Sequence, residues 1–281
     1  MLEEKERLEI EKIEVKLFVE AAYLRYGYDF RDYSRAHIKR RLSRRVKLMG
    51  LPGITRLTEL ILYDAEVFQQ ILTDFSINVT EMFRHPLFFR NLRTEIVPVL
   101  RTYPSFTIWH AGCSTGEEVL STAILLEEEG LLNRAMIYAT DMNGAVLEVA
   151  REGIYSAKDI KKWTKNYQES GGRKSFSDYF VVNYDYAIVS QKLQKRISYM
   201  EHNLVTDGRF IGADLILCRN VLIYFNRTLQ NRVLDLFNES LRPGGFLGIG
   251  SKEEIKFSSV GDAFEKVANC QKIYKKKIEG I

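Results

Sequence analysis

The sequence predicts an α/β protein in which a parallel sheet carries helices on both faces and follows a small all-α domain. Two observations favour this fold class. From residue 106 onward, short β-rich runs alternate with amphipathic helical stretches, which is the pattern of a parallel sheet with crossover helices. Before residue 86, every periodic stretch has helical spacing. We therefore expect a helical domain over 1–85 and a sheet domain over 86–281.

The N-terminal domain is expected to consist of helices joined by short turns. Apolar residues recur at helical intervals in the stretches 13–26, 35–49, 57–63 and 66–75. Gly50 and the pair Pro52-Gly53 follow the second stretch and are typical stop signals for a helix. These stretches together predict a small helical unit.

Strands and helices are expected in turn in the sheet domain. The predicted strands are 106–111, 135–140, 196–201, 214–219 and 246–251, and the predicted helices are 117–129, 145–152 and 228–241. Arg-Pro-Gly-Gly at 242–245 is expected to end the last helix, and residues 270–278 to add an antiparallel edge strand. The stretch 155–195 is expected to be a loop with a small β-hairpin subdomain, inserted at about 175–198.

Composition excludes several classes of protein. No run approaches the roughly 20 apolar residues of a membrane span, and the acidic, charged start is unlike a secretory signal. The three cysteines fit neither a disulfide framework nor a zinc site, and the four histidines lack the spacing of a metal site or a catalytic triad. We expect a soluble, cytoplasmic protein without a metal ion or membrane insertion.

The net charge of +4 conceals one strongly basic segment. Residues 31–47 hold eight Lys or Arg and one Asp, a local charge of +7, so the rest of the chain carries −3. As a helix, the segment would pack Ile38, Leu42, Val46 and Met49 on one face. The cationic side chains expected elsewhere on it are Arg40, Arg41, Arg44, Arg45 and Lys47. This surface is either a solvated face or a docking site for nucleic acid, anionic lipid or an acidic protein.

The first predicted strand ends in a glycine loop, Ala-Gly-Cys-Ser-Thr-Gly-Glu-Glu at 111–118, which runs directly into a helix. Ligands of open α/β sheets bind at the carboxyl ends of the strands, where a glycine such as Gly112 allows close approach of the backbone. The second strand is followed by Asp141, 25 residues after Gly116, where a carboxylate can accept hydrogen bonds from ribose hydroxyls. These features predict an adenosine-containing ligand.

Glu117 and Glu118 extend the glycine loop and help to choose between adenosine ligands. Carboxylates suit a cation better than a pyrophosphate, and S-adenosylmethionine carries an ammonium and a sulfonium but no phosphate. We therefore expect S-adenosylmethionine as the methyl donor and S-adenosylhomocysteine as the product. The loop sequence leaves open which of the two glutamates faces the ligand.

With these features, the chain resembles the CheR family of chemotaxis receptor protein-glutamate O-methyltransferases. The family motif Asn-x-Thr-x-Phe-Phe-Arg is similar to residues 78–84, with Met82 in place of the first Phe. Ala-Thr-Asp at 139–141, Asn-Leu at 203–204 and Cys-Arg-Asn-Val-Leu-Ile-Tyr-Phe at 218–225 follow in the family order, and residues 31–47 match its arginine-rich helix. The resemblance covers residues 15–275 and implies a Rossmann-like S-adenosylmethionine methyltransferase sheet.

The resemblance also implies the site residues and favours Glu118 as the ligand-facing acid. The expected lining of the S-adenosylmethionine site, with Gly112 of the loop, is Asn78, Thr80, Arg84, Glu118, Asp141, Asn203, Leu204, Arg219 and Asn220. Arg84 and Tyr224 are expected nearest the transferred methyl group. Each has a structural alternative, in which Asn78 and Asp141 are helix caps, Arg84 is a surface residue and Tyr224 is a core aromatic.

The implied reaction is methyl transfer to glutamate side chains of methyl-accepting chemotaxis receptors during adaptation. A carboxylate is already anionic at pH 7, so the transfer requires no general base. The basic helix would dock on the cytoplasmic helical domain of the receptor. We expect a monomer that binds no nucleic acid and, because 179–198 contains no glycine, no receptor tail peptide. Two alternatives stay open, namely a same-fold O-methyltransferase for another protein or small carboxylate, and a nucleic-acid-binding module.

Overall fold

The computed structural model describes residues 4–75 and 80–278, and the chain divides into two compact units. The first unit is Met1–Ile77 with Ile223–Gln230, and the second is Asn78–Leu222 with Asn231–Ile281. The division falls earlier than the expected boundary at residue 85. A short segment that follows a strand of the sheet domain also belongs to the first unit, which the sequence did not indicate.

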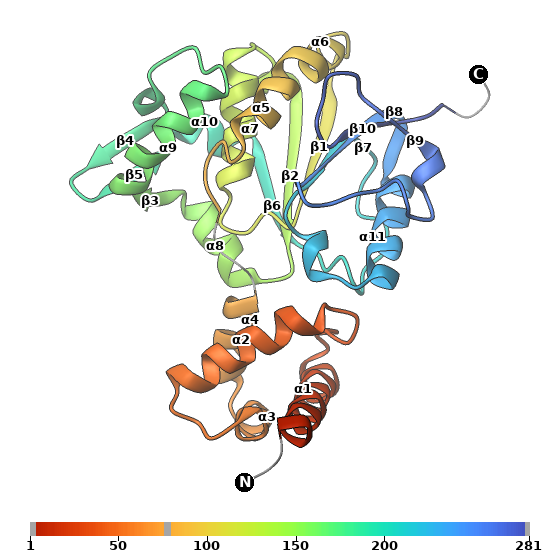
Figure 1. The fold of residues 1–281 in the computed structure, drawn as a ribbon. Helices are drawn as coiled ribbons and strands as arrows, with labels where there is room; N and C mark the ends of the chain where they lie inside the picture. The colour runs from red at the N-terminus through yellow and green to blue at the C-terminus, as the bar shows by residue number, and fades with distance from the viewer. Residues whose placement is uncertain (1–3, 76–79, 279–281) are drawn as a thin grey trace. The chain divides into compact units, whose positions relative to one another are not determined.

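The described part of the first unit consists mainly of helices (Figure 1). They are α1 (Glu4–Tyr26), α2 (Arg35–Leu48), α3 (Ile54–Tyr63) and α4 (Ala65–Phe75), which confirms the four helical stretches. Aromatic rings form much of the core between them. Phe75 packs edge to face against Phe18 and Phe30, with centroids 6.3 and 4.9 Å away, and Tyr26 stacks on Phe68 at 4.0 Å.

A seven-stranded sheet in the order β6-β2-β1-β7-β8-β10-β9 forms the centre of the second unit. The mutually parallel strands are β1 (Phe106–Ala111), β2 (Ala135–Asp141), β6 (Ile197–Glu201), β7 (Ala213–Cys218) and β8 (Leu241–Ile249). β10 (Ile273–Lys276) runs antiparallel to β8 and to β9 (Phe264–Lys266). Every residue of β1 and of β7 is buried, as expected for strands covered on both faces. The predicted α/β class is confirmed.

Helices connect these strands in the expected alternation. α7 (Glu117–Glu128) follows β1, α8 (Gly144–Glu152) follows β2, and α11 (Arg227–Ser240) links β7 to β8. Before β1, α5 (Pro86–Asn91) continues through a π-helical turn at Leu92–Ile96 into α6 (Val97–Leu100). The buried sides of these helices complete the core of the second unit.

The expected hairpin is part of a separate three-stranded antiparallel sheet, seen at the left of Figure 1. Its strands are β3 (Ile154–Ser156), β5 (Tyr186–Val189) and β4 (Phe180–Asn183), with β5 in the middle. α9 (Ala157–Glu169) and the short α10 (Gln191–Gln194) flank it.

Three sequence expectations are wrong in detail. Residues 157–169 form α9 rather than a loop: Ile160, Trp163 and Tyr167 make a buried face, but the many polar residues between them weaken the apolar signal. Arg-Pro-Gly-Gly at 242–245 lies inside β8, where an irregular register beside Asp214 accommodates it. The edge strand is β9, because β10 is covered by it on the outer side.

The topology gathers several loops at one edge of the sheet. Because β1, β2, β6, β7 and β8 run parallel, the loops that follow them lie at the same edge. These loops contain most of the expected ligand-binding residues, at 112–118, 141, 203–204 and 219–220.

Candidate functional site

The loop after β1 is held so tightly that two of its positions require glycine. Gly112 has φ of +76°, and a Cβ there would lie 2.6 Å from Cγ2 of Val221. Its amide donates to the carbonyl of Thr140 at 2.8 Å. Gly116 has φ of +89°, and a Cβ there would lie 3.0 Å from that of Ala150. Glycine therefore lets this loop pack closely against Val221 and Ala150, which fixes its path at the strand ends.

Asp141 joins the loops that follow β1 and β2. Its Oδ2 accepts from the Ser114 amide at 2.9 Å, and its Oδ1 accepts from the Asn143 amide at 3.1 Å. Burial raises the pKa of Asp141, and these hydrogen bonds oppose the rise. The helix-cap alternative for Asp141 is wrong, because Asn143 caps α8 by accepting from the Ala145 amide at 3.0 Å.

The two glutamates at the start of α7 have different surroundings. Glu117 is buried and accepts from the Thr115 hydroxyl at 2.7 Å and from Thr80. Burial raises the pKa of Glu117 to about 7. Glu118 is more open, with 18% of its side chain exposed, and its Oε2 lies 2.6 Å from Nη1 of Arg219. Of the two, Glu118 is the carboxylate that a ligand can reach.

Arg219 occupies a closed setting at the end of β7. Only 1% of its side chain is exposed, and Nη2 donates to the carbonyl of Arg84 at 3.2 Å. The same Nη2 lies 3.1 Å from Nδ1 of His85, whose pKa is lowered by burial and by Arg219. The guanidinium carbon is 3.9 Å from the centre of the Phe88 ring. Arg219 thus connects α7 to the segment before β1 through contacts within the second unit.

His110 lies beside this ion pair but does not join it as a charged group. Its Nδ1 is 3.9 Å from Oε1 of Glu118. Complete burial and the neighbouring Arg219 lower the pKa of His110 to about 3. The imidazole is therefore neutral at pH 7.

Glu253 is a residue at this edge that sequence reasoning missed. It is 4% exposed, and its Oε2 accepts from the amides of Asn220, at 3.2 Å, and of Gly250. Asn220 has φ of +64°, a conformation that is uncommon outside glycine. Glu253 therefore fixes the loop that carries Asn220. The sequence around Glu253, Lys-Glu-Glu, suggests a solvated turn. Only its position shortly after a predicted strand could have indicated a role at the strand ends.

Asn203 and Leu204 follow β6 at the same edge. The Asn203 side chain accepts from the Val205 amide at 3.0 Å, and its own amide donates to Asp207 at 2.9 Å. Leu204 is 7% exposed. These contacts form a compact turn directly after His202, whose amide donates to the Asp141 carbonyl at 3.1 Å.

The segment before α5 is described only from residue 80 onward, so Asn78 lies outside the described residues. Thr80 is half-buried and hydrogen-bonds to Glu117. Arg84 is half-buried as well, and its amide donates to the carbonyl of Glu81 at 3.3 Å. Thr80 and Arg84 therefore contact the two residues, Glu117 and Arg219, that organise the start of α7 and the end of β7.

Tyr224 belongs to the segment that joins the first unit. Its carbonyl accepts from the Ser34 amide at 2.7 Å, and its ring meets His37 edge to face at 5.2 Å. Tyr224 is half-buried. The neighbouring Phe225 is buried and packs against Tyr33 at 5.0 Å. The core-aromatic alternative therefore describes Phe225 better than Tyr224, and a joint role of Tyr224 with Arg84 stays a prediction.

The basic segment forms α2, and its cations fall into two groups. Arg45 lies 2.6 Å from the Asp74 carboxylate, and Arg41 donates to the Asp74 carbonyl, so both are anchored on α4. The exposed cations among the five expected docking residues are Arg40, Arg44 and Lys47. On the opposite face Ile38 and Leu42 are buried as predicted, whereas the predicted partners Val46 and Met49 are only half-buried near the helix end.

Residues 4–75 and 80–278 contain neither a cluster of metal-binding side chains nor a membrane-spanning helix. No group of three or more His, Cys, Asp or Glu side chains could hold a metal ion there. No helix in these ranges is long and apolar enough to cross a membrane.

Two family models match the chain. The CheR methyltransferase all-alpha domain matches residues 13–76, and the CheR methyltransferase SAM binding domain matches residues 78–273. A Pseudomonas putida protein named "Putative methyltransferase Cher3" is 48% identical over 264 residues, which cover 94% of this chain and 97% of that protein. The "Chemotaxis protein methyltransferase" of Listeria monocytogenes is 30% identical, with 82% and 85% covered, and that of Escherichia coli is 28% identical, with 90% and 88% covered.

Proposed function

Since the chain belongs to the CheR methyltransferase family, we propose that it transfers methyl groups from S-adenosylmethionine to glutamate side chains of chemotaxis receptors. The products are glutamate methyl esters and S-adenosylhomocysteine. The observation that carries the proposal is the common edge of the parallel strands in the S-adenosylmethionine-binding domain. A tightly packed glycine loop, a buried Asp141 and an accessible Glu118 lie there.

The donor set at this edge fits S-adenosylmethionine. Asp141 can accept hydrogen bonds from the ribose hydroxyls, and Glu118 can attract the ammonium. Gly112 and Gly116 let the loop pack closely against Val221 and Ala150 and so fix its path at this edge. The other residues proposed to line the site are Asn78, Thr80, Arg84, Asn203, Leu204, Arg219 and Asn220. Arg219 would act there mainly by holding Glu118 in place, because its guanidinium is covered.

The reaction requires orientation of the acceptor carboxylate rather than proton transfer. The bound donor supplies a methyl on sulfonium, so the acceptor oxygen forms the C–O bond while the C–S bond breaks and its electron pair stays on sulfur. The acceptor carboxylate is ionised at pH 7 and needs no base. Arg84 and Tyr224 are proposed to orient the acceptor carboxylate, and positioning of this kind is worth about 7 to 11 kcal/mol.

The exposed cations of α2 support an acidic protein partner. Arg40, Arg44 and Lys47 project from α2 without burial, whereas Arg41 and Arg45 are anchored on α4. An acceptor glutamate on a receptor helix is itself acidic, so a cationic surface attracts and steers it. We therefore propose that α2 docks on the cytoplasmic helical domain of the receptor and that nucleic acid is not a partner.

Methyl transfer to receptor fragments tests the proposal. The chain is incubated with methyl-labelled S-adenosylmethionine and the cytoplasmic domain of a chemotaxis receptor, and base-labile label on the receptor is counted. We expect label that disappears when the accepting glutamates are changed to alanine and when Asp141→Ala removes donor binding. Label that appears only on other proteins or on small carboxylates would assign the enzyme to a different acceptor.

The proposed roles of Arg84 and Tyr224 are tested separately from donor binding. Arg84→Ala and Tyr224→Phe are expected to lower turnover while calorimetry still detects binding of S-adenosylhomocysteine. Tyr184→Phe is the matched control, because this tyrosine is 97% exposed on the hairpin. Full turnover in both variants would disprove the assignment.

Two further expectations about partners stay proposals. The absence of glycine from residues 179–198 supports a hairpin that does not bind a receptor tail peptide. β4 is an edge strand of its sheet, so an extended peptide can pair with it. Calorimetry with a receptor tail peptide therefore tests the proposal, and clear binding would contradict it. A monomer is also proposed, and light scattering during gel filtration measures its mass in solution.

A further inference from the structure

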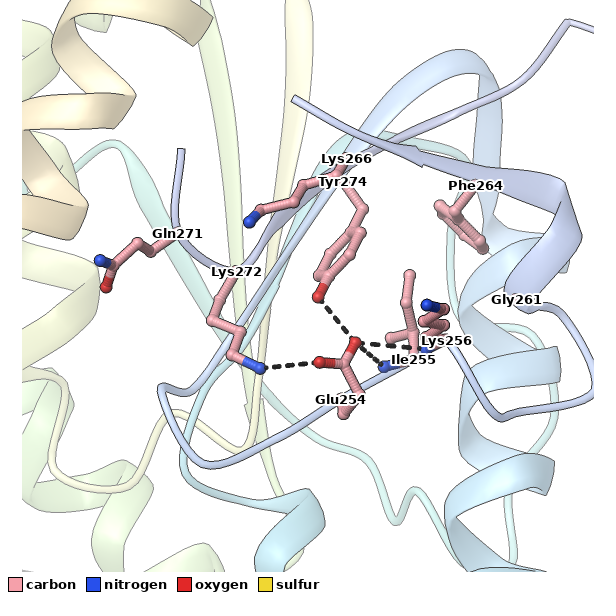
Figure 2. Close-up of a pocket in the computed structure, with 9 residues that line it drawn as sticks. All are labelled: Glu254, Ile255, Lys256, Gly261, Phe264, Lys266, Gln271, Lys272 and Tyr274. Carbon is pink, nitrogen blue, oxygen red and sulfur yellow. Dashed lines mark hydrogen bonds and ion pairs between the residues drawn. The ribbon is translucent and has the colours of Figure 1, made fainter. Parts of the chain in front are cut away.

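A cavity of about 530 Å³ lies in the second unit, and Figure 2 shows the residues that line it. It is lined by the turn after β8, by both ends of β9 and by the start of β10. Its volume falls in the range of about 300 to 1000 Å³ that is typical of small-molecule sites. The proposed methyl transfer uses none of its lining residues.

The one carboxylate that lines the cavity is already satisfied. Glu254 accepts from the Tyr274 hydroxyl at 3.0 Å, from the Lys272 ammonium at 3.1 Å and from the amides of Ile255 and Lys256 at 3.0 and 3.3 Å, contacts that Figure 2 shows as dashed lines. Burial opposes ionisation, but these hydrogen bonds outweigh it and lower the pKa of Glu254 to about 2. Glu254 is thus a fixed structural anion that neutralises Lys272.

Two further lysines leave the lining with positive charge. Lys256 and Lys266 line the cavity, and neither forms an ion pair with a carboxylate within residues 4–75 and 80–278. Three lysines and one glutamate give the lining a net charge of +2. Lys266 lies directly opposite Tyr274 in the pairing of β9 with β10, so both side chains project from the same face of the sheet.

Apolar groups complete the wall between these charges. Ile255 is 1% exposed, Phe264 is 6% exposed and Tyr274 is 7% exposed, and all three line the cavity. Two of them are aromatic. A wall of this composition favours a ligand with a ring or another apolar body, and the lysines favour a negatively charged group on it.

Glu254 of the cavity is adjacent in sequence to Glu253, which contacts the edge proposed to bind the methyl donor. The carboxylate of Glu254 lines the cavity, whereas that of Glu253 accepts from the amides of Asn220 and Gly250 at the ends of β7 and β8. The two adjacent carboxylates therefore serve different sites. A ligand in the cavity would not need to displace S-adenosylmethionine.

We propose that this cavity is a second binding site, which accepts a small organic anion with an aromatic or apolar body. Lys256 and Lys266, whose side chains lie on opposite sides of the Tyr274 ring in Figure 2, supply the positive charge that attracts the anionic group, and Ile255, Phe264 and Tyr274 supply the apolar wall. The site is independent of the proposed receptor methylation and would stand if the acceptor were a different carboxylate.

Fluorescence titration with 1-anilinonaphthalene-8-sulfonate tests the proposal, because this probe combines a sulfonate with aromatic rings. The full-length chain is saturated with S-adenosylhomocysteine beforehand so that the donor site is filled. We expect saturable binding of about one probe per chain. In Lys256→Gln/Lys266→Gln, the loss of two charge contacts should weaken binding at least about tenfold.

Lys275→Gln is the matched control, since Lys275 is the neighbour of Tyr274 on β10 and projects from the other face of the sheet. It should bind the probe like the unmodified chain. Thermal unfolding of each variant establishes that the fold is retained. Equal affinity in the double variant and the unmodified chain would overturn the proposal. One-to-one displacement of the probe when S-adenosylhomocysteine is added to a chain not previously saturated with it would overturn it as well.

Discussion

Glu118 Oε2 lies 2.6 Å from Arg219 Nη1, and this ion pair joins the first turn of α7 to the loop after β7. The two side chains differ in exposure, since 18% of Glu118 but only 1% of Arg219 is exposed. Arg219 therefore depends on Glu118 for its counter-charge, whereas Glu118 keeps a side open to solvent. One carboxylate can thus stabilise the loop and remain available to a cationic ligand.

Glu118→Ala is expected to cost about 3 to 5 kcal/mol of unfolding free energy, because it leaves a buried guanidinium without its counter-charge. Adding Arg219→Met should restore part of the loss, since the uncompensated charge is then gone. Urea unfolding of both single variants and the double variant measures the coupling. Glu148→Ala is the control, with 68% of its side chain exposed. Strictly additive losses would contradict the dependence of Arg219 on Glu118.

Gly112→Ala and Gly130→Ala separate backbone strain from steric overlap. Both glycines have positive φ, at +76° and +69°, but a Cβ at Gly130 would meet nothing within 4 Å. Gly112→Ala should therefore be less stable than Gly130→Ala by about 1 to 3 kcal/mol, the cost of overpacking against Val221. It should also weaken binding of S-adenosylhomocysteine.

Substitution of Val221 tests whether steric overlap explains the loss of stability in Gly112→Ala. Val221→Ala removes the methyl group that a Cβ at Gly112 would meet at 2.6 Å. Combined with Gly112→Ala, it should bring stability close to that of Gly130→Ala. If the double variant is no more stable than Gly112→Ala, overlap with Val221 is not the cause.

Glu117 is expected to make stability fall as pH rises. Its pKa is about 7 in the folded chain against 4.5 for the ordinary group, because burial disfavours the ion. The folded state therefore holds an extra proton between these values. The resulting stabilisation is complete below about pH 4.5 and is lost as pH passes through 7.

Glu117→Gln removes this titration. Between pH 5 and pH 8, the unmodified chain should lose about 2 to 3 kcal/mol more unfolding free energy than the variant. Urea unfolding at both pH values gives the difference, and Glu148→Gln controls for loss of a carboxylate from an exposed position. Parallel pH profiles for the unmodified chain and Glu117→Gln would show that Glu117 does not titrate in this range.

The strand-end chemistry could be predicted from the sequence because it depends on local order along the chain. Each parallel strand is a short buried run, and the residue type that follows it, such as Gly112 or Asp141, is visible without coordinates. Parallel pairing then brings these residues to one edge whatever the loop details are. For that reason the fold class follows from the sequence, and so does the placement of these residues at one edge of the sheet.

Contacts between distant segments could not be predicted in this way. Glu253 looks like part of a solvated Lys-Glu-Glu turn until β8 brings it to the Asn220 amide. Asp74 likewise gives no sign that it accepts from Arg41 and Arg45, residues about 30 positions away on another helix. Such partners depend on tertiary packing, and charge patterning alone cannot divide anchored cations from free ones.

The cations of α2 that are anchored on α4 and those that are exposed should have different effects on folding and on docking. Arg45→Ala should lower the unfolding free energy by about 1 to 3 kcal/mol, because its side chain is only 16% exposed and its Nε lies 2.6 Å from Asp74 Oδ2. The triple reversal Arg40→Glu/Arg44→Glu/Lys47→Glu should keep stability within about 1 kcal/mol, since these side chains are exposed. It should retain affinity for S-adenosylhomocysteine as well.

Receptor methylation, unlike stability, should depend on the exposed cations of α2 and not on Arg45. The triple reversal is expected to slow methyl transfer to receptor fragments at least about tenfold at low salt, because it replaces attraction of an acidic surface by repulsion. Raising the ionic strength should shrink the difference from the unmodified chain, since salt screens exposed charges over about 10 Å at 0.1 M. Arg45→Ala, assayed below its unfolding temperature, should transfer methyl groups normally. If the triple reversal methylates receptors at the unmodified rate, α2 does not dock on the receptor and its exposed cations are only a solvated face.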